Sequence, residues 1–191
     1  MQLLMDRILK DGKVIGNDIL KVDSFLNHQL DIELFNEMGK EFKRLYKDSE
    51  ITKILTIEAS GIAIASIAAQ YFNVPVVFAK KYSGTNMDKD NYEAEVYSFT
   101  KNTTYNIKVS KQYINSSDKI LLIDDFLANG RALLGLSSIV KQAGAEIVGA
   151  GIVIEKAFQG GREIVEKEGI RVEALASIEK MELGKVIFKE Y

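Results

Sequence analysis

The chain has 191 residues, of which 47% are hydrophobic, and its formal net charge at pH 7 is -2. This length allows one domain with a sizeable core, and the near balance of charge provides no basic surface for nucleic acid. Cysteine is absent, which excludes disulfides and thiolate metal sites and fits a reducing compartment, and the single histidine, His28, excludes a histidine cluster.

Two helices are predicted near the N-terminus. Apolar residues at helical spacing predict a short helix over 1–10 that stops at Gly12. Asp31 is placed to cap a second helix, whose inner face consists of Leu34, Phe35, Met38, Phe42 and Leu45. Charged residues interrupt the first segment, so it does not resemble a signal peptide, and no apolar run is long enough to span a membrane. We expect a soluble, cytoplasmic protein with no membrane partner.

From residue 54 onward, predicted strands and helices alternate. The strands are expected over 54–57, 76–79, 147–154, 172–178 and 186–188, and the helices over 61–72 and 162–168. This alternation is typical of an α/β fold with a mostly parallel sheet.

The region from Tyr82 to Lys119 departs from this alternation. Apolar and polar residues alternate one by one over 94–99 and 105–109, which predicts an antiparallel hairpin. The polar approach to it, over 83–92, is interpreted either as a lid that closes beside a ligand or as an ordinary surface loop.

The most informative stretch is KILLIDDFLANGRALLG, residues 119–135. The apolar run over 120–123 predicts a strand covered on both faces, which we expect to end at Asp124 and Asp125. A loop of small residues, 128–130, then leads into a helix. Backbone N–H groups at a helix N-terminus favour phosphate, and the carboxylates suit ribose hydroxyls. The spacings of the P-loop and of the dinucleotide-binding turn are absent, which makes ATP and NAD weak candidates.

Within that stretch, LLIDDFLANG resembles the phosphoribosyl pyrophosphate motif of the type I phosphoribosyltransferases. Other segments resemble the bacterial xanthine phosphoribosyltransferases over nearly the whole chain. They are VDSFLNHQ (22–29), TIEASGIA (56–63), VYSFTK (96–101), VKQAGA (140–145) and GIVIEKAFQ (151–159). The resemblance implies a single domain with the type I phosphoribosyltransferase fold, a hood over about 1–36, and a flexible loop with its hairpin over about 82–117.

The resemblance also implies an activity. Phosphoribosyl would pass from 5-phosphoribosyl 1-pyrophosphate to N9 of xanthine, giving xanthosine 5'-monophosphate and pyrophosphate in purine salvage. Mg²⁺ would be carried by the pyrophosphate substrate rather than by a dedicated protein site. The enzyme would be a homodimer, with Lys80, Lys81 and Tyr82 placed where relatives pass residues toward a neighbour's site.

Several site residues follow from the resemblance. The residues that match the loop around the 5-phosphate are Ala128, Asn129, Gly130, Arg131 and Ala132, while Asp124 and Asp125 match the acidic pair near the ribose. Many relatives have threonine in this loop, and many 6-oxopurine relatives have a carboxylate at the position of Ala128. Backbone N–H groups must therefore supply more of the phosphate binding here, and the general base is unassigned.

A turn that holds pyrophosphate in relatives matches Glu58, Ala59, Ser60 and Gly61, and it often contains a cis non-proline peptide. Without the resemblance, Gly61 would be interpreted as a glycine that starts a helix.

The resemblance assigns the purine to three residues. Leu20 in the hood would cover the ring, and Asn27 offers the donors and the acceptor that a base with two exocyclic oxygens needs. An isolated asparagine in a loop is otherwise typical of a turn. Lys156 matches a lysine that contacts an exocyclic oxygen. Phe126 could stack on the base or belong to the core.

Two other classes of protein are alternatives. A regulator with this fold would sense purines or phosphoribosyl pyrophosphate while binding nucleic acid, but the chain has neither surplus positive charge nor length for a DNA-binding domain. A flavodoxin-like or receiver-type domain could also place two acidic residues after a strand, but it would not explain the hood, the hairpin or EASG.

Overall fold

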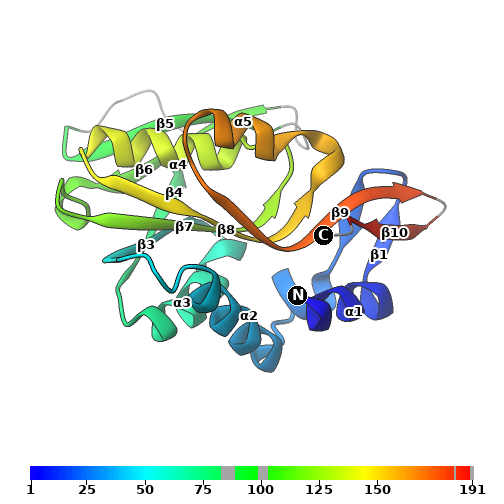
Figure 1. The fold of residues 1–191 in the computed structure, drawn as a ribbon. Coiled ribbons are helices and arrows are strands. Elements are labelled where there is room, and N and C mark those ends of the chain that lie inside the picture. The colour runs from blue at the N-terminus through cyan, green and yellow to red at the C-terminus, as the bar shows by residue number, and fades with distance from the viewer. Residues whose placement is uncertain (83–88, 99–102, 183, 190–191) are drawn as a thin grey trace.

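The structure is a computed structural model that describes residues 1–82, 89–98, 103–182 and 184–189 (Figure 1). Its helices are α1 (Gln2–Asp11), α2 (Ile32–Leu45), α3 (Ser60–Phe72), α4 (Arg131–Gln142) and α5 (Gly161–Lys167), with a π-helical turn η1 (Asp23–Asn27) and 3-10 turns η2 (Lys111–Tyr113) and η3 (Ala157–Gln159). Its strands are β1 (Lys13–Ile15), β2 (Ile19–Lys21), β3 (Lys53–Ile57), β4 (Val76–Tyr82), β5 (Asn91–Ser98), β6 (Thr103–Ser110), β7 (Lys119–Leu127), β8 (Glu146–Lys156), β9 (Val172–Glu182) and β10 (Lys185–Phe188).

One eight-stranded sheet organises the chain. Its strands lie in the order β10, β9, β8, β7, β3, β4, β6 and β5. The pairs from β9 through β4 are parallel, while β10 and the β5–β6 hairpin add antiparallel strands at the two edges. The predicted mostly parallel α/β sheet and the predicted antiparallel hairpin are both confirmed.

Helices cover both faces of this sheet. In Figure 1, α4 and α5 lie on one face, and α2 and α3 lie on the other. Neighbouring side chains of β7 point to opposite faces: Leu121 and Ile123 belong to the core under α2 and α3, whereas Ile120 and Leu122 belong to the core under α4. This two-sided burial explains the continuous apolar run.

The hairpin packs closely on α4. A β-carbon added to Gly135 would lie 2.5 Å from Cγ2 of Val96 and 3.3 Å from Cδ1 of Ile107. The missing side chain therefore lets β5 and β6 approach the helix that follows the predicted phosphate loop.

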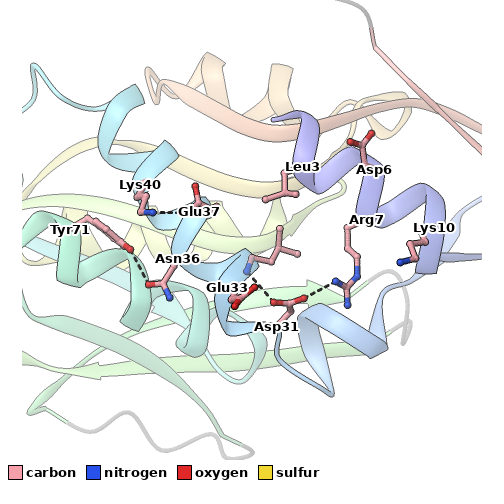
Figure 2. A pocket seen from close by; sticks show the side chains of 11 residues that line it. Leu3, Asp6, Arg7, Lys10, Asp31, Glu33, Asn36, Glu37, Lys40 and Tyr71 are labelled. Atoms are coloured by element: carbon pink, nitrogen blue, oxygen red, sulfur yellow. Dashed lines mark hydrogen bonds and ion pairs between the residues drawn. The ribbon is translucent and has the colours of Figure 1, made fainter.

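The N-terminal segment contains structure that the sequence did not predict. β1 and β2 form a separate antiparallel pair with Lys13 opposite Lys21, and η1 follows directly. α1 is fastened to the start of α2, because Nη1 of Arg7 donates to Oδ2 of Asp31 at 2.7 Å (Figure 2). Asp31 also caps α2 as predicted, since its Oδ1 accepts from the backbone N–H of Leu34 at 3.1 Å.

Figure 2 shows the groove between α1 and α2, which contains a cavity of about 620 Å³. Arg7, Asp31 and Tyr71 are among its lining residues, and none of the predicted substrate-binding residues lines it. In the part of the chain that the structure describes, no helix has the length and apolar character needed to cross a membrane.

Asp31→Ala is expected to lower the free energy of unfolding by about 1 to 2 kcal/mol, because the substitution removes the cap of α2 and leaves Arg7 without this partner. Urea unfolding followed by circular dichroism measures the change. Asp48→Ala, at an exposed position, is the control and should change stability by less than about 0.5 kcal/mol. Equal stability of the two variants would contradict the assigned role of the cap.

Candidate functional site

The acidic pair lies within a strand rather than after one. β7 continues from Lys119 to Leu127, so the prediction that Asp124 and Asp125 end this strand is wrong. Asp124 is paired with Ile152 of β8, and the pairing continues to Leu127. Because β8 runs beside β7 at this point, backbone hydrogen bonding continues where the side chains become charged. Asp124 is consequently buried, with 5% of its surface exposed.

This burial has an electrostatic consequence. Burial raises the pKa of the Asp124 carboxyl well above its ordinary value, the negative charge of Asp125 raises it further, and Lys81 opposes the shift. Oδ1 of Asp124 accepts a 2.9 Å hydrogen bond from the N–H of Asp125, and Oδ1 of Asp125 accepts one of 2.9 Å from the N–H of Phe126. The hydrogen bond from Asp125 N–H opposes the rise in the pKa of Asp124, but burial is the largest cause and the pKa stays raised.

Asp124→Asn is expected to raise the melting temperature of the ligand-free protein by a few degrees at neutral pH. Because its pKa is raised, Asp124 of the folded protein still holds a proton at pH values where the same residue of the unfolded chain has lost it. The free energy of unfolding therefore falls as the pH rises through that interval. Asparagine carries no charge and avoids this loss. Thermal melts of both proteins measure the difference, which should shrink at acidic pH; a difference that grows on acidification would contradict the prediction.

The loop after β7 has the predicted position. Ala128, Asn129 and Gly130 connect β7 to α4, and Gly130 precedes the helix with φ 78° and ψ 0°. Glycine adopts this left-handed backbone at little cost. Among the described residues no side chain caps α4, so its first N–H groups are available to an anion together with the positive end of the helix dipole. Arg131 is exposed and Ala132 half-buried beside them.

The EASG turn lies next to the acidic pair. The peptide bond between Glu58 and Ala59 is cis, as the resemblance implied, and α3 begins at Ser60. A β-carbon added to Gly61 would lie 2.1 Å from Oγ1 of Thr56 and 3.5 Å from Oδ1 of Asp124. Only glycine allows this approach, so Gly61 is more than a helix-start residue. The carboxylate of Glu58 accepts from the backbone N–H of Lys81, which ties the turn to β4.

Lys156 lies at the end of β8 and reaches the N-terminal segment. Its Nζ donates to the backbone carbonyl of Asp18 at 2.6 Å and lies 5.5 Å from the centre of the Phe126 ring. Burial lowers the pKa of Lys156, and the charge of Asp18 opposes that shift. Phe126 is partly buried and packs against the core, with one face toward the lysine. This position is compatible with both interpretations of Phe126.

The two predicted hood residues differ in environment. Leu20 lies on β2, is 6% exposed, and belongs to the core. Asn27 ends η1 and is exposed; within the described ranges its side chain makes no hydrogen bond. The bond from Lys156 to Asp18 brings the β2 region to the end of β8, whereas no hydrogen bond joins the Asn27 side chain to the other predicted residues that the structure describes.

Comparison with known proteins decides the family. The family model for the phosphoribosyl transferase domain matches residues 22–175. The chain belongs to the phosphoribosyltransferase family. A xanthine phosphoribosyltransferase of Clostridium novyi is 66% identical over 189 residues, covering 99% of this chain and 100% of that protein. Xanthine phosphoribosyltransferase 2 of Clostridium botulinum (strain Hall) is 64% identical over 190 residues, with 99% and 100% covered. The resemblance stated from the sequence is confirmed.

Solved structures agree on the fold. The APRTase of Giardia lamblia, complexed with 9-deazaadenine, superposes with a TM-score of 0.78 and 23% identity, covering 91% of this chain and 97% of that one. At this identity the likeness shows the fold alone, and it confirms the predicted type I phosphoribosyltransferase fold.

Residues of β4 and β6 also approach the acidic pair, and sequence reasoning missed this. Nζ of Lys81 lies 5.1 Å from the centre of the Tyr105 ring. Burial raises the pKa of Tyr105, and the charge of Asp124 raises it further. Thr56 is fully buried, and its Oγ1 has no hydrogen-bond partner among the described residues. In the sequence Tyr105 is one residue of the alternating pattern over 105–109, and such a pattern carries no information about which other strand the side chain approaches.

The predicted lid over 83–92 falls largely outside the described residues, because 83–88 are not among them. The last two residues of that range, Asn91 and Tyr92, begin β5.

Proposed function

We propose that this chain is a xanthine phosphoribosyltransferase of purine salvage. It transfers phosphoribosyl from 5-phosphoribosyl 1-pyrophosphate to N9 of xanthine, and the products are xanthosine 5'-monophosphate and pyrophosphate. The observation that carries the proposal is the acidic pair of β7, whose buried member Asp124 lies beside the Gly61 turn and whose strand leads into a loop at the N-terminus of α4. Full-length identity of 66% to a xanthine phosphoribosyltransferase supports this choice of reaction.

In this proposal the phosphoribosyl substrate occupies the loop and the turn. The backbone N–H groups over 128–132 bind the 5-phosphate, with added charge from Arg131. The turn over 58–61 holds the pyrophosphate, and Gly61 permits its close approach to the acidic pair. Asp124 and Asp125 bind the ribose hydroxyls.

The purine is placed at the end of β8. Lys156 has three N–H donors, of which one is used by Asp18, so the others are available to an exocyclic oxygen of xanthine. Leu20 covers the ring, and Asn27, which is exposed, donates to and accepts from the edge of the base. Adenine has an exocyclic amine instead of this oxygen and would be disfavoured beside an ammonium group.

The reaction exchanges one bond at C1 of the ribose for another. The bond from C1 to the pyrophosphate oxygen breaks, the oxygen keeps the electron pair, and a lone pair on N9 forms the new bond as the base loses a proton. Positive charge develops on the sugar between these events, by analogy with glycosyl transfer. Asp124 and Asp125 stabilise this charge. The residue that accepts the proton is unassigned, because the loop has Ala128 where a carboxylate would be expected.

Mg²⁺ is proposed to enter with the pyrophosphate substrate and to neutralise the leaving group. Within the described ranges, no group of three or more histidine, cysteine, aspartate or glutamate side chains is arranged to hold a metal. Oxygens of the pyrophosphate substrate, together with water, would supply the coordination that Mg²⁺ prefers.

The surrounding assembly is part of the same proposal. The chain is one domain in which residues 1–36 form a hood over the base. Two copies form a homodimer, in which Lys80 and Tyr82 approach the neighbouring site while Lys81 stays beside the acidic pair of its own chain. The absence of cysteine supports a location in the cytoplasm.

The decisive experiment offers the purified protein xanthine, guanine, hypoxanthine, adenine and orotate in turn, with Mg²⁺ and 5-phosphoribosyl 1-pyrophosphate. Liquid chromatography of the nucleotides should show xanthosine 5'-monophosphate, with the highest kcat/KM for xanthine. Consumption of no base would contradict the proposal and favour a regulator. A preference for adenine or orotate would contradict the assigned substrate.

A further inference from the structure

The first turn of α5 contacts the predicted phosphate loop. A β-carbon added to Gly161 would lie 2.3 Å from the carbonyl oxygen of Ala128 and 2.9 Å from the backbone nitrogen of Gly130. In the other direction, a β-carbon on Gly130 would lie 3.0 Å from Cγ2 of Val165 and 3.1 Å from the carbonyl oxygen of Gly161. The atoms on the two sides of this contact belong to the backbone or to the buried side chain of Val165. A side chain added at either glycine would therefore displace the loop.

The residue after Gly161 joins α5 to the other half of the site. Nε and Nη2 of Arg162 each donate to the carboxylate of Glu155 at 2.8 Å, and Nη1 donates to the carbonyl of Val172 at 2.7 Å. Glu155 is only 2% exposed. A buried carboxylate held by a two-pronged guanidinium is a directional contact that an ammonium group cannot reproduce.

Glu155 occupies a position between the two predicted substrate subsites. It precedes Lys156 in the chain, and it is paired across β7 and β8 with Leu127, the residue before the phosphate loop. The ion pair therefore fixes α5 against the point where β7 enters the loop and β8 reaches the lysine. Figure 1 shows α5 on the same side of the sheet as α4.

We propose that Gly161, Arg162 and Glu155 form a brace that positions the phosphate loop and Lys156 relative to each other. None of the three touches substrate; they are positioning residues, and this role rests on the proposed function. The Gly161 contact sets where the loop presents its N–H groups. The Arg162–Glu155 pair sets the distance between those groups and the lysine, and so keeps C1 of the ribose and N9 of the base in reacting geometry.

The first test compares two neighbouring glycines. Gly161→Ala should raise the KM for 5-phosphoribosyl 1-pyrophosphate by about tenfold or more, because the added methyl displaces the loop. It should also weaken the binding of ribose 5-phosphate, which carries the same phosphate, in calorimetry. Gly160→Ala is the matched control: Gly160 has φ 71°, so alanine is strained there, but its β-carbon would meet nothing within 4 Å. A folded Gly161→Ala variant whose KM and ribose 5-phosphate affinity match those of the control overturns the proposal.

The second test addresses the ion pair. The double variant Glu155→Gln, Arg162→Met removes both charges, so no uncompensated buried charge remains to unfold the protein. The proposal predicts a higher KM for both substrates, and the single variant Arg162→Lys, which keeps the charge but not the two-pronged geometry, should raise both KM values as well. A merely structural pair would lower the melting temperature and leave both KM values unchanged, which would refute the brace. If the native protein consumes no base yet binds ribose 5-phosphate, and Gly161→Ala weakens that binding, the proposed reaction fails while the positioning of the loop stands.

Discussion

The double variant Asp124→Asn, Asp125→Asn is expected to lose about a hundredfold or more of its kcat. In the proposed complex the pair is the negative charge that the protein supplies beside the ribose, and the departure of pyrophosphate places positive charge on that ring. In the free protein, burial favours a proton on Asp124. A cationic sugar reverses this preference, because a positive charge nearby stabilises the carboxylate. Asparagine keeps the shape of both side chains and supplies no negative charge in the transition state.

Steady-state kinetics with xanthine measure this loss. Asp118→Asn is the matched control, because Asp118 is also a buried acid, 7% exposed, and lies just before the opposite end of β7. It is paired with Lys53 at 2.8 Å, so its loss should cost stability and leave kcat near the native value. Undiminished turnover by the Asp124, Asp125 double variant would refute the role given to the acidic pair.

Lys156→Ala is expected to raise the KM for xanthine by about tenfold to a hundredfold, in line with the loss of a charge-assisted hydrogen bond worth about 1.5 to 3 kcal/mol. The KM for 5-phosphoribosyl 1-pyrophosphate should change far less, because the lysine lies at the end of β8 and not at the phosphate loop. Selectivity for xanthine over adenine should fall as well, since the ammonium group is the element that distinguishes an oxygen from an amine.

Initial rates with each substrate varied in turn separate the two KM values. Lys141→Ala removes an exposed lysine that pairs with Glu168 at 2.7 Å, and it should leave both values unchanged. An equal rise of the two KM values in Lys156→Ala would disprove a specific contact with the base.

The sequence predicted best those elements whose apolar residues recur with a strict period. The alternation along β5 and β6 predicted their pairing, and the spacing of apolar residues after Asp31 predicted α2 and its cap. The course of β7 was predicted wrongly, because two charged residues usually end a buried strand. Here the partner strand β8 continues past them and satisfies their backbone groups.

A resemblance of sequence can propose those parts of the candidate site that consist of consecutive residues. The loop over 128–132 and the turn over 58–61 are both local in this sense, and their roles stay predictions. β1 and β2 were missed because strands of three residues are too short to show a period. The contact of Gly161 with the phosphate loop and the approach of Tyr105 to Asp124 depend on how distant strands and helices pack. No local pattern contains that information.

The hydrogen bond from Lys156 to Asp18 spans 138 positions of the chain. It means that one ammonium group serves both the packing of the N-terminal segment and the proposed recognition of xanthine. The two effects are thermodynamically linked. A bound base that keeps Lys156 in place slows local opening of β1 and β2, and a change that destabilises those strands lowers the affinity for the base. Amide exchange in residues 13–21 would thus report purine occupancy from outside the reaction centre.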